Sequence, residues 1–424
     1  MRFFVLFLIL VSSAATAQVT NYKLADLDNE TSSPGAAIAV SPKNNKNMVA
    51  YAAGKVMYSN DGGVTWKQST FTFGETGSAL PSMTADTKGN FYMVYSTSAF
   101  TDIFATSSGD DGKTWSVPFS ISAPSTRQQY NPSITAHPKK EEVMVTWTQT
   151  DQYGANAEDC TSDIMMVTGS GKKWSKPLQV NQTKGNCLDG DFTVRGSVPI
   201  IGHDGKIFIL WSGRGATFYD RSYDGDMWLS TDLAIVEQVD GWNIEVAGFG
   251  TIANNAVLAV DNSPSRIRGT LFMAYSDTRS GVKDGDVWLM RSVNRGDNWT
   301  VAARINQDEP GREQFLPRMF IDPASGIVYL LYYDRRNYED NQTDVYLAWS
   351  TDGGSQFKEK KINEKPFTPA LDSKTAMANY LGLSAQKGLI IPVWTVINGD
   401  KQEVWTAIVK EYELNPAPAA PPKK

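Results

Sequence analysis

Acidic side chains recur along this chain in front of short apolar runs, at one position of a repeated pattern. The six acids are Asp102, Asp163, Asp226, Asp286, Asp344 and Glu403. Carboxylate oxygens are hard ligands that suit a cation such as calcium, but a carboxylate in a loop also accepts hydrogen bonds from nearby backbone amides. Because one acid per repeat is typical of a repeated structural role, we expect each acid to bond amides of its own loop.

The densest acidic segment is residues 223–226, which read Tyr-Asp-Gly-Asp and form the best single candidate for a calcium site. The segment lacks the twelve-residue pattern of an EF-hand. His137 and His203 are the only histidines in the sequence, and they give no cluster of metal ligands. We therefore expect no cofactor, with calcium as the one metal left open.

Four eight-residue segments share a turn motif. Residues 59–66 and 108–115 both read S-x-D-x-G-x-T-W; residues 350–357 keep Ser, Asp, Gly and an aromatic residue, and residues 292–299 keep Ser, Gly and Trp. In such a turn the Ser and Asp side chains bond backbone amides, Gly supplies a positive φ, and Trp packs between neighbouring sheets. None of these groups is chemically reactive, so the motif marks a fold and not a site.

The motif resembles the Asp-box, or BNR repeat, of sialidases and other β-propellers. A repeat spaced by tens of residues indicates an array of one supersecondary unit, and here the array covers nearly the whole mature chain. The resemblance therefore implies an all-β propeller. Catalytic sialidase domains have six blades, and this sequence departs from that number.

Seven units can be counted. Each contains short runs rich in aromatic and β-branched residues, separated by Gly, Asn, Asp and Pro. The seventh unit ends after its third run, near Tyr412, whereas an extra run at residues 21–27 precedes the first unit. We predict seven four-stranded blades, with the N-terminal run completing the last blade so that no sheet edge stays open. In the fourth unit we place the third strand at residues 227–229, which makes 212–226 a long loop.

The resemblance also implies a catalytic set. Sialidases hold the substrate carboxylate with three arginines and use a Tyr nucleophile paired to a Glu, with an Asp as acid and base. Matching residue types lie near the inner strands and in the connections between blades. They are Arg127, Arg195 and Arg318 for the carboxylate, Tyr380 for the nucleophile, Glu245 or Glu313 as its partner, and Asp189 or Asp191 as the acid and base.

The sequence departs from sialidases at the first arginine, because the first inner run begins Pro34-Gly35 and carries no R-I-P motif. Tyr380 has a second interpretation as an aromatic residue packed at the centre of the ring. Convergence of the three arginines with Tyr380 and one Glu would favour catalysis, whereas side chains that point apart or pair with aspartates would favour binding alone.

The N-terminus is predicted to be a signal peptide, residues 1–17. Arg2 is followed by an apolar run at 3–11, too short to span a bilayer, and by an A-x-A site at 15–17. A single propeller domain would then cover 18–414, and the Pro- and Ala-rich residues 415–424 are expected to be disordered. We expect an exported protein, periplasmic or extracellular.

The two cysteines agree with export. Cys160 and Cys187 fall in neighbouring loops on the same predicted face of the third blade. In an oxidising compartment a disulfide is favoured over two free thiols.

The net charge of −6 is modest and not clustered, which disfavours nucleic acid or an anionic membrane as partner. We expect a monomer. Two functions remain, since a fold implies no activity by itself. One is a secreted exo-glycosidase acting on sialic or other acidic sugars, and the other is a non-catalytic propeller that binds glycan or protein at the cell envelope.

Overall fold

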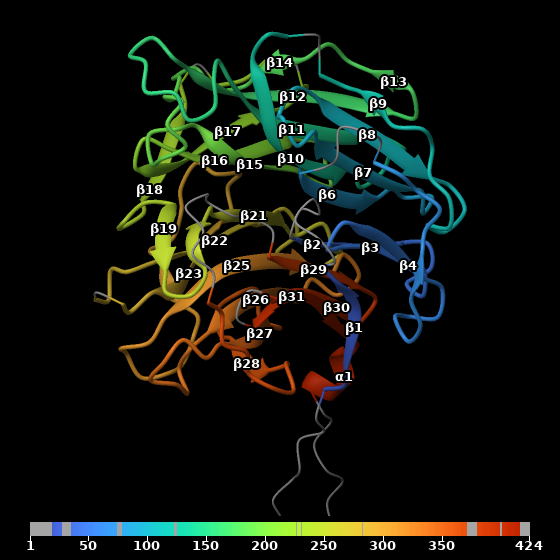
Figure 1. Cartoon of the computed structure of the whole chain (residues 1–424), viewed down its shortest axis with the longest axis vertical. Coiled ribbons are helices and arrows are strands. Elements are labelled where there is room, and N and C mark those ends of the chain that lie inside the picture. Colours follow the sequence, from blue (N-terminus) through green and yellow to red (C-terminus); the bar gives the residue numbers. More distant parts are fainter. Residues whose placement is uncertain are drawn as a thin grey trace, which may run out of the picture.

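The computed structural model describes residues 19–27, 35–73, 79–122, 125–225, 227–229, 231–281, 283–370, 380–398 and 401–415. Seven four-stranded antiparallel sheets follow one another around a ring and form a β-propeller (Figure 1). This confirms the predicted all-β architecture and the number of blades. The predicted signal peptide, residues 1–17, and the tail from residue 416 onward lie outside the described residues.

The blades follow the order of the chain, and the first strand of each lies toward the middle of the ring (Figure 1). Blade 1 consists of β2 (Ala36–Val40), β3 (Met48–Ala52), β4 (Lys55–Ser59) and β5 (Lys67–Gln68). Blade 2 consists of β6 (Ala79–Ala85), β7 (Phe91–Ser96), β8 (Ile103–Ser108) and β9 (Phe119–Ser120). Blade 3 consists of β10 (Gln128–Ala136), β11 (Val143–Thr150) and β12 (Ser162–Ser170), with β13 (Lys173–Trp174) and β14 (Leu178–Gln179) both paired to β12. Blade 4 consists of β15 (Arg195–Ile201), β16 (Ile207–Gly213), β17 (Ala216–Ser222) and β18 (Leu233–Glu237). Blade 5 consists of β21 (Val257–Val260), β22 (Leu271–Asp277), β23 (Asp286–Ser292) and β24 (Ala303–Arg304). Blade 6 consists of β25 (Gln314–Ile321), β26 (Val328–Asp334), β27 (Asp344–Ser350) and β28 (Lys358–Lys361). Blade 7 is β29 (Leu381–Gln386), β30 (Leu389–Asn398), β31 (Lys401–Ala407) and β1 (Asn21–Asp26), with β32 (Val409–Lys410) also paired to β30.

The N-terminal strand closes the ring. β1 pairs antiparallel with β31, with Asn21 opposite Ala407 and Asp26 opposite Glu403, and Figure 1 shows the blue β1 beside the red strands of blade 7. Leu24 and Ala25 are buried in the cluster that joins blade 7 to blade 1. The predicted closure by the N-terminal run is therefore correct.

The core lies between the blades. All seven residues of β26, from Val328 to Asp334, are buried, and its apolar side chains join two clusters, one toward blade 5 and one toward blade 7. A strand covered on both faces needs apolar side chains on both, which explains the continuous apolar runs of the sequence. No described helix is long and apolar enough to cross a membrane; α1 (Glu411–Leu414) has four residues.

The repeated motif forms the turn between the third and fourth strands. In blade 1 the Ser59 hydroxyl donates to Asp61 at 2.8 Å and accepts the Gly63 amide at 3.0 Å, while Asp61 accepts the Thr65 amide at 2.9 Å. Equivalent bonds occur in the segments that begin at Ser108, Ser292 and Ser350. We call the face that carries these turns the lower face.

Blade 4 differs from the prediction. Its third strand is β17 and not residues 227–229, because Arg214 and Gly215, both with positive φ, make a tight turn directly after β16. Residues 212–226 are therefore no long upper loop. Residues 223–225 instead follow β17 on the lower face, where Ser222 binds Asp224 at 3.2 Å and the Gly225 amide at 2.9 Å, as in the other turns. The calcium candidate is thus part of a structural turn, and its Asp226 lies outside the described residues.

The acids before the third strands bind side chains of their own blade. Asp286 accepts Asn306 Nδ2 at 2.7 Å, and Asn306 Oδ1 in turn accepts the Val287 amide at 2.9 Å. The same clamp joins Asp344 to Asn363 in blade 6 and Asp163 to Asn181 in blade 3. Among the described acids of this set only Asp102 bonds an amide of its own loop, that of Ile103. The expectation of loop amides was therefore wrong for most of them, although the role is structural.

Replacing Leu24 by Ala tests the closure. The substitution removes buried methyl groups between blades 7 and 1 and should lower the free energy of unfolding by about 2–4 kcal/mol. The control is Lys23→Ala, which removes exposed ion pairs to Asp26 and Glu403 and should change stability by less than about 1 kcal/mol. Chemical denaturation of both variants gives the comparison, and equal effects would contradict a closing role for β1.

A pH dependence should arise inside blade 4. Burial raises the pKa of the Asp220 carboxyl to about 6, although the hydrogen bonds that it accepts from the Arg221 amide and Gln182 lower this pKa. An acid whose pKa is higher in the folded state loses its contribution to stability as pH rises. The free energy of unfolding should therefore fall between about pH 4 and pH 6, and Asp220→Asn should flatten that fall in denaturation curves measured at each pH.

Candidate functional site

We call the face of the ring where the inner strands begin and the second strands end the upper face. A pocket of about 320 Å³ opens on this face. It lies between blades 5 and 6 and a hairpin, β19 (Asn243–Val246) and β20 (Gly250–Ala253), that connects blade 4 to blade 5. We call it the hairpin pocket. Its apolar side chains are Val239, Ile244, Val246 and Phe315, and its charged ones are Asp240, Glu245, Asp277, Lys283 and Glu313.

The charged groups of the pocket differ in what they bind. Asp277 pairs with Arg279 at 2.6 Å and Glu313 with Arg335 at 2.7 Å. Within the part of the chain that the structure describes, neither Glu245 nor Lys283 forms a hydrogen bond or an ion pair through its side chain, and both side chains are exposed. One carboxylate and one ammonium are thus available to a ligand.

The hairpin is fixed at its base and at its tip. At the base, the Asp191 carboxylate accepts the backbone amides of Trp242 at 3.1 Å and Asn243 at 3.3 Å. At the tip, Arg335 donates to the Ala247 carbonyl at 2.6 Å while it holds Glu313. Because blades 3 and 6 both fix this wall, the pocket is preorganised for a ligand.

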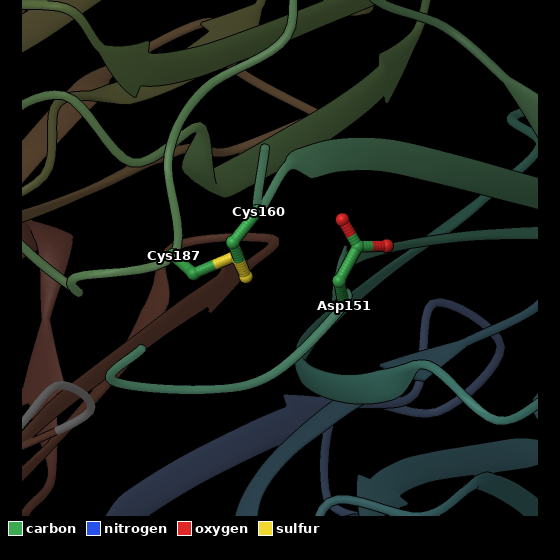
Figure 2. Close-up of side chains that lie close together, drawn as sticks. All are labelled: Asp151, Cys160 and Cys187. Carbon is green, nitrogen blue, oxygen red and sulfur yellow. A yellow bond between two sulfur atoms is a disulfide. The ribbon is translucent and has the colours of Figure 1, made fainter. Parts of the chain in front are cut away.

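Asp191 belongs to a loop, residues 187–193, that we call the anchor loop. Its first residue forms the predicted disulfide with Cys160, which is therefore confirmed (Figure 2). The Asp151 carboxylate lies beside the two sulfur atoms, within 4.8 Å. Cysteine binds metal as a thiolate, which a disulfide cannot supply, and Asp151 already accepts the Thr161 amide at 2.7 Å. The group is therefore a structural one.

Arg195 is buried below the anchor loop, with 1% of its surface exposed. It is ion-paired with Asp189 of that loop, and its guanidinium lies 4.5 Å from the Trp242 ring centre and 5.7 Å from that of Tyr130. Burial alone would lower the pKa of Arg195, but Asp189, Tyr130 and Tyr153 together outweigh this effect and the pKa is raised. Arg195 therefore links the anchor loop to the residue before β19.

The other two predicted arginines lie elsewhere. Arg127 pairs with Asp151 at 2.7 Å and Asp163 at 2.8 Å, which fastens the loop between the second and third strands of blade 3. Arg318 lines the central channel, where it donates to the carbonyls of Leu381 at 3.2 Å and Pro317 at 3.1 Å. Burial lowers the pKa of Arg318 to about 10.

Tyr380 is packed in the core, with 1% exposed, against Phe249 and beneath Tyr333. Its hydroxyl has no hydrogen-bond partner among the described residues, and burial raises the pKa of the phenol. A tyrosine nucleophile needs a neighbouring base and access to substrate, and the described residues around Tyr380 supply neither.

Of the residues predicted from the resemblance, the hairpin pocket brings together two, Glu245 and Glu313. Asp189 and Asp191 belong to the anchor loop and support the base of the hairpin. The three arginines lie apart from one another. Sequence reasoning missed the hairpin itself and Lys283. The alternating run Asn243–Val246 before Gly248 was the available signal for the hairpin, whereas nothing in the sequence placed Lys283 beside Glu245.

No protein-family model matches this sequence, and no curated protein matches it. Solved structures share its fold at low identity. The NanB sialidase from Streptococcus pneumoniae is 10% identical, with a TM-score of 0.51 over 82% of this chain and 70% of that one. A structure described as YCF48 bound to D1 peptide is 14% identical, with a TM-score of 0.50 over 95% and 98%. A protein of unknown function from Dyadobacter fermentans is 14% identical, with a TM-score of 0.50 over 78% and 94%. The likeness is one of fold.

Substituting Asp191 by Ala should loosen the pocket wall. The amides of Trp242 and Asn243 lose a charged acceptor, so hydrogen exchange across residues 242–246 should rise about tenfold, the equivalent of one such bond. Exchange in β26 should not change. The matched control is Asp159→Ala, an exposed acid of the neighbouring loop, and unchanged exchange in 242–246 would contradict the anchoring role of Asp191.

Proposed function

We propose that this chain is a non-catalytic binding propeller, and that the hairpin pocket takes a neutral sugar unit of a glycan. The observation that carries the proposal is that Glu245 and Lys283, whose side chains have no partner among the described residues, line one preorganised pocket together with apolar walls. Binding sites for small ligands combine apolar walls with a few polar groups that fix orientation. Hydroxyl groups of a sugar can both donate to Glu245 and accept from Lys283.

The charges of the pocket argue against an acidic sugar. Glu245, Glu313, Asp240 and Asp277 line it, and like charges at an interface are unfavourable. The arginines that would hold a carboxylate are engaged in ion pairs or in the central channel. Because the three arginines do not converge with Tyr380, the arrangement favours binding over sialidase catalysis.

The rim of the pocket extends the surface for a longer ligand. Asp191 contacts the backbone beside Gly241, so the anchor loop and residues 239–240 form one continuous surface. Phe192 and Leu188 of the anchor loop are 62% and 46% exposed. An exposed aromatic ring held on a disulfide-fixed loop suits the apolar face of a second sugar or a protein side chain.

The place of action that we propose is outside the cytoplasm, at the cell envelope, with the chain acting as a monomer. The disulfide supports this, because such bonds persist in oxidising compartments. The predicted signal peptide at 1–17 and the exposed ligand face agree with it.

A glycan array with the mature chain, followed by calorimetry on the best ligand, tests the proposal. We expect Glu245→Gln and Lys283→Met each to weaken binding about tenfold, since each removes a charged hydrogen bond. The control is Glu158→Gln, an exposed acid on another upper loop, which should bind as the wild type does. Absence of any glycan ligand, or equal binding by all variants, would refute this function.

A second candidate is a glycoside hydrolase that uses Glu245 and Glu313. The observation in its favour is that both carboxylates line one pocket, as the acid and base of glycosidases do. We expect no hydrolysis of a fluorogenic α-sialoside or of aryl glycosides of neutral sugars. Turnover of a neutral glycoside that Glu313→Gln abolishes, with the fold intact by circular dichroism, would replace the first candidate by this one.

A further inference from the structure

A second concave surface lies on the rim between blades 1 and 2, three blades away from the hairpin pocket. It has a volume of about 500 Å³, and we call it the aromatic groove. Its walls include Phe71, Phe73, Phe104, Trp115 and Pro118. The rings of Phe71 and Phe73 meet edge to face, 4.8 Å apart, and all five side chains are partly exposed.

Trp115 in this groove lacks the hydrogen bond that its counterparts in blades 1 and 3 make. In blade 1 the indole N–H of Trp66 donates to the carbonyl of Gly63 at 2.9 Å, and Trp174 in blade 3 donates to Gly171 at 2.9 Å. In blade 2 the corresponding carbonyl, that of Gly112, accepts the Ser69 hydroxyl at 2.6 Å.

The indole nitrogen of Trp115 is consequently buried without an acceptor among the described residues. A buried donor without an acceptor is unfavourable, and a ligand carbonyl would supply the missing acceptor. Trp299 in blade 5 also lacks an acceptor but does not line this groove.

Aromatic walls with an available indole N–H suit one class of ligand. A polyproline II segment makes no internal hydrogen bonds, so its carbonyls are free to accept, and its proline rings fit between aromatic side chains. Residues 416–422 of this chain read P-A-P-A-A-P-P, which contains the P-x-x-P spacing, and two lysines follow.

A path leads from the described end of the chain to the groove. Asn415 is bonded to Trp349 at 3.1 Å and lines a lower-face groove that extends to Asp61 and Val64 in the turn of blade 1. That turn contacts the turn of blade 2, because Asn60 donates to the Asp111 carbonyl at 3.4 Å. Seven residues in polyproline II reach about 22 Å.

We propose that the aromatic groove is a docking site for a proline-rich segment, and that its occupant is residues 416–422 of the same chain. The segment runs along the lower-face groove past the blade 1 turn and places a carbonyl on the indole N–H of Trp115. Asp110 and Asp111 stand in the same turn as Trp115 and favour the lysines that end the segment. Docking would cover aromatic surface that is otherwise exposed.

The test uses the chain with ¹⁵N-labelled tryptophan, in which Trp115→Phe identifies the Trp115 indole signal. Deletion of residues 416–424 should shift that signal and raise the solvent exchange of its N–H at least fivefold. The signals of Trp66 and Trp299 should stay unchanged. Excess peptide of sequence 416–424 should restore the Trp115 signal in the shortened chain, and a peptide with alanine at every proline should not.

An identical Trp115 signal with and without the segment would overturn the proposal. So would restoration by the proline-free peptide, or tail-dependent dimerisation on sedimentation, since the segment would then serve another site or another copy. Trp299→Phe is the matched control, because it removes an unpaired indole N–H outside the groove. None of these outcomes depends on the hairpin pocket binding a glycan.

Discussion

Antiparallel pairing between β1 and β31 is the interaction on which the rest of the structure depends. It joins residues nearly 400 positions apart in the sequence and gives blade 7 its fourth strand. With the ring closed, every blade packs between two neighbours. The closure also sets all seven blades in one orientation, so that turns gather on the lower face and long connections on the upper face.

Buried charges reinforce this frame at blade 3 and at its connection to blade 4. Around the anchor loop, Arg195 and Asp189 form an ion pair enclosed by aromatic rings, and Arg127 joins Asp151 to Asp163. Removing one partner of such a pair leaves a buried charge, which is strongly destabilising. These arginines therefore hold loops in place: Arg127 fastens a loop of blade 3, and Arg195 supports the anchor loop and packs on Trp242 at the base of the hairpin. Glu245 and Lys283 are the charged side chains of the hairpin pocket that form no hydrogen bond or ion pair among the described residues.

The fold was predictable because its evidence is local and repeated. A turn such as 59–66 is stabilised by its own side chains, so its sequence reports its structure wherever it occurs. The same reasoning failed in blade 4, where a tight turn at Arg214 and Gly215 hid β17. It also missed the hairpin β19–β20, an insertion that occurs once and thus has no repeat to reveal it.

The site was less predictable because it depends on tertiary contacts. Residue types alone placed Arg195 and Asp189 in a catalytic set, whereas their burial and mutual pairing assign them to the support of a loop. Cys160 and Cys187 were an exception, since only two cysteines were available to pair. Lys283 could not be found, because its place in the same pocket as Glu245 comes from the packing of blade 5 against the inserted hairpin.

The most direct test of the account is a hydrogen-exchange footprint of the full chain, with and without the best glycan from the array. We expect slower exchange in residues 239–246, 276–278, 283–285 and 313–315, which hold most of the lining of the hairpin pocket, with the other inner strands unaffected. Protection centred on the channel around Arg318 and Tyr380, with none at the hairpin, would contradict the assignment of the ligand to this pocket.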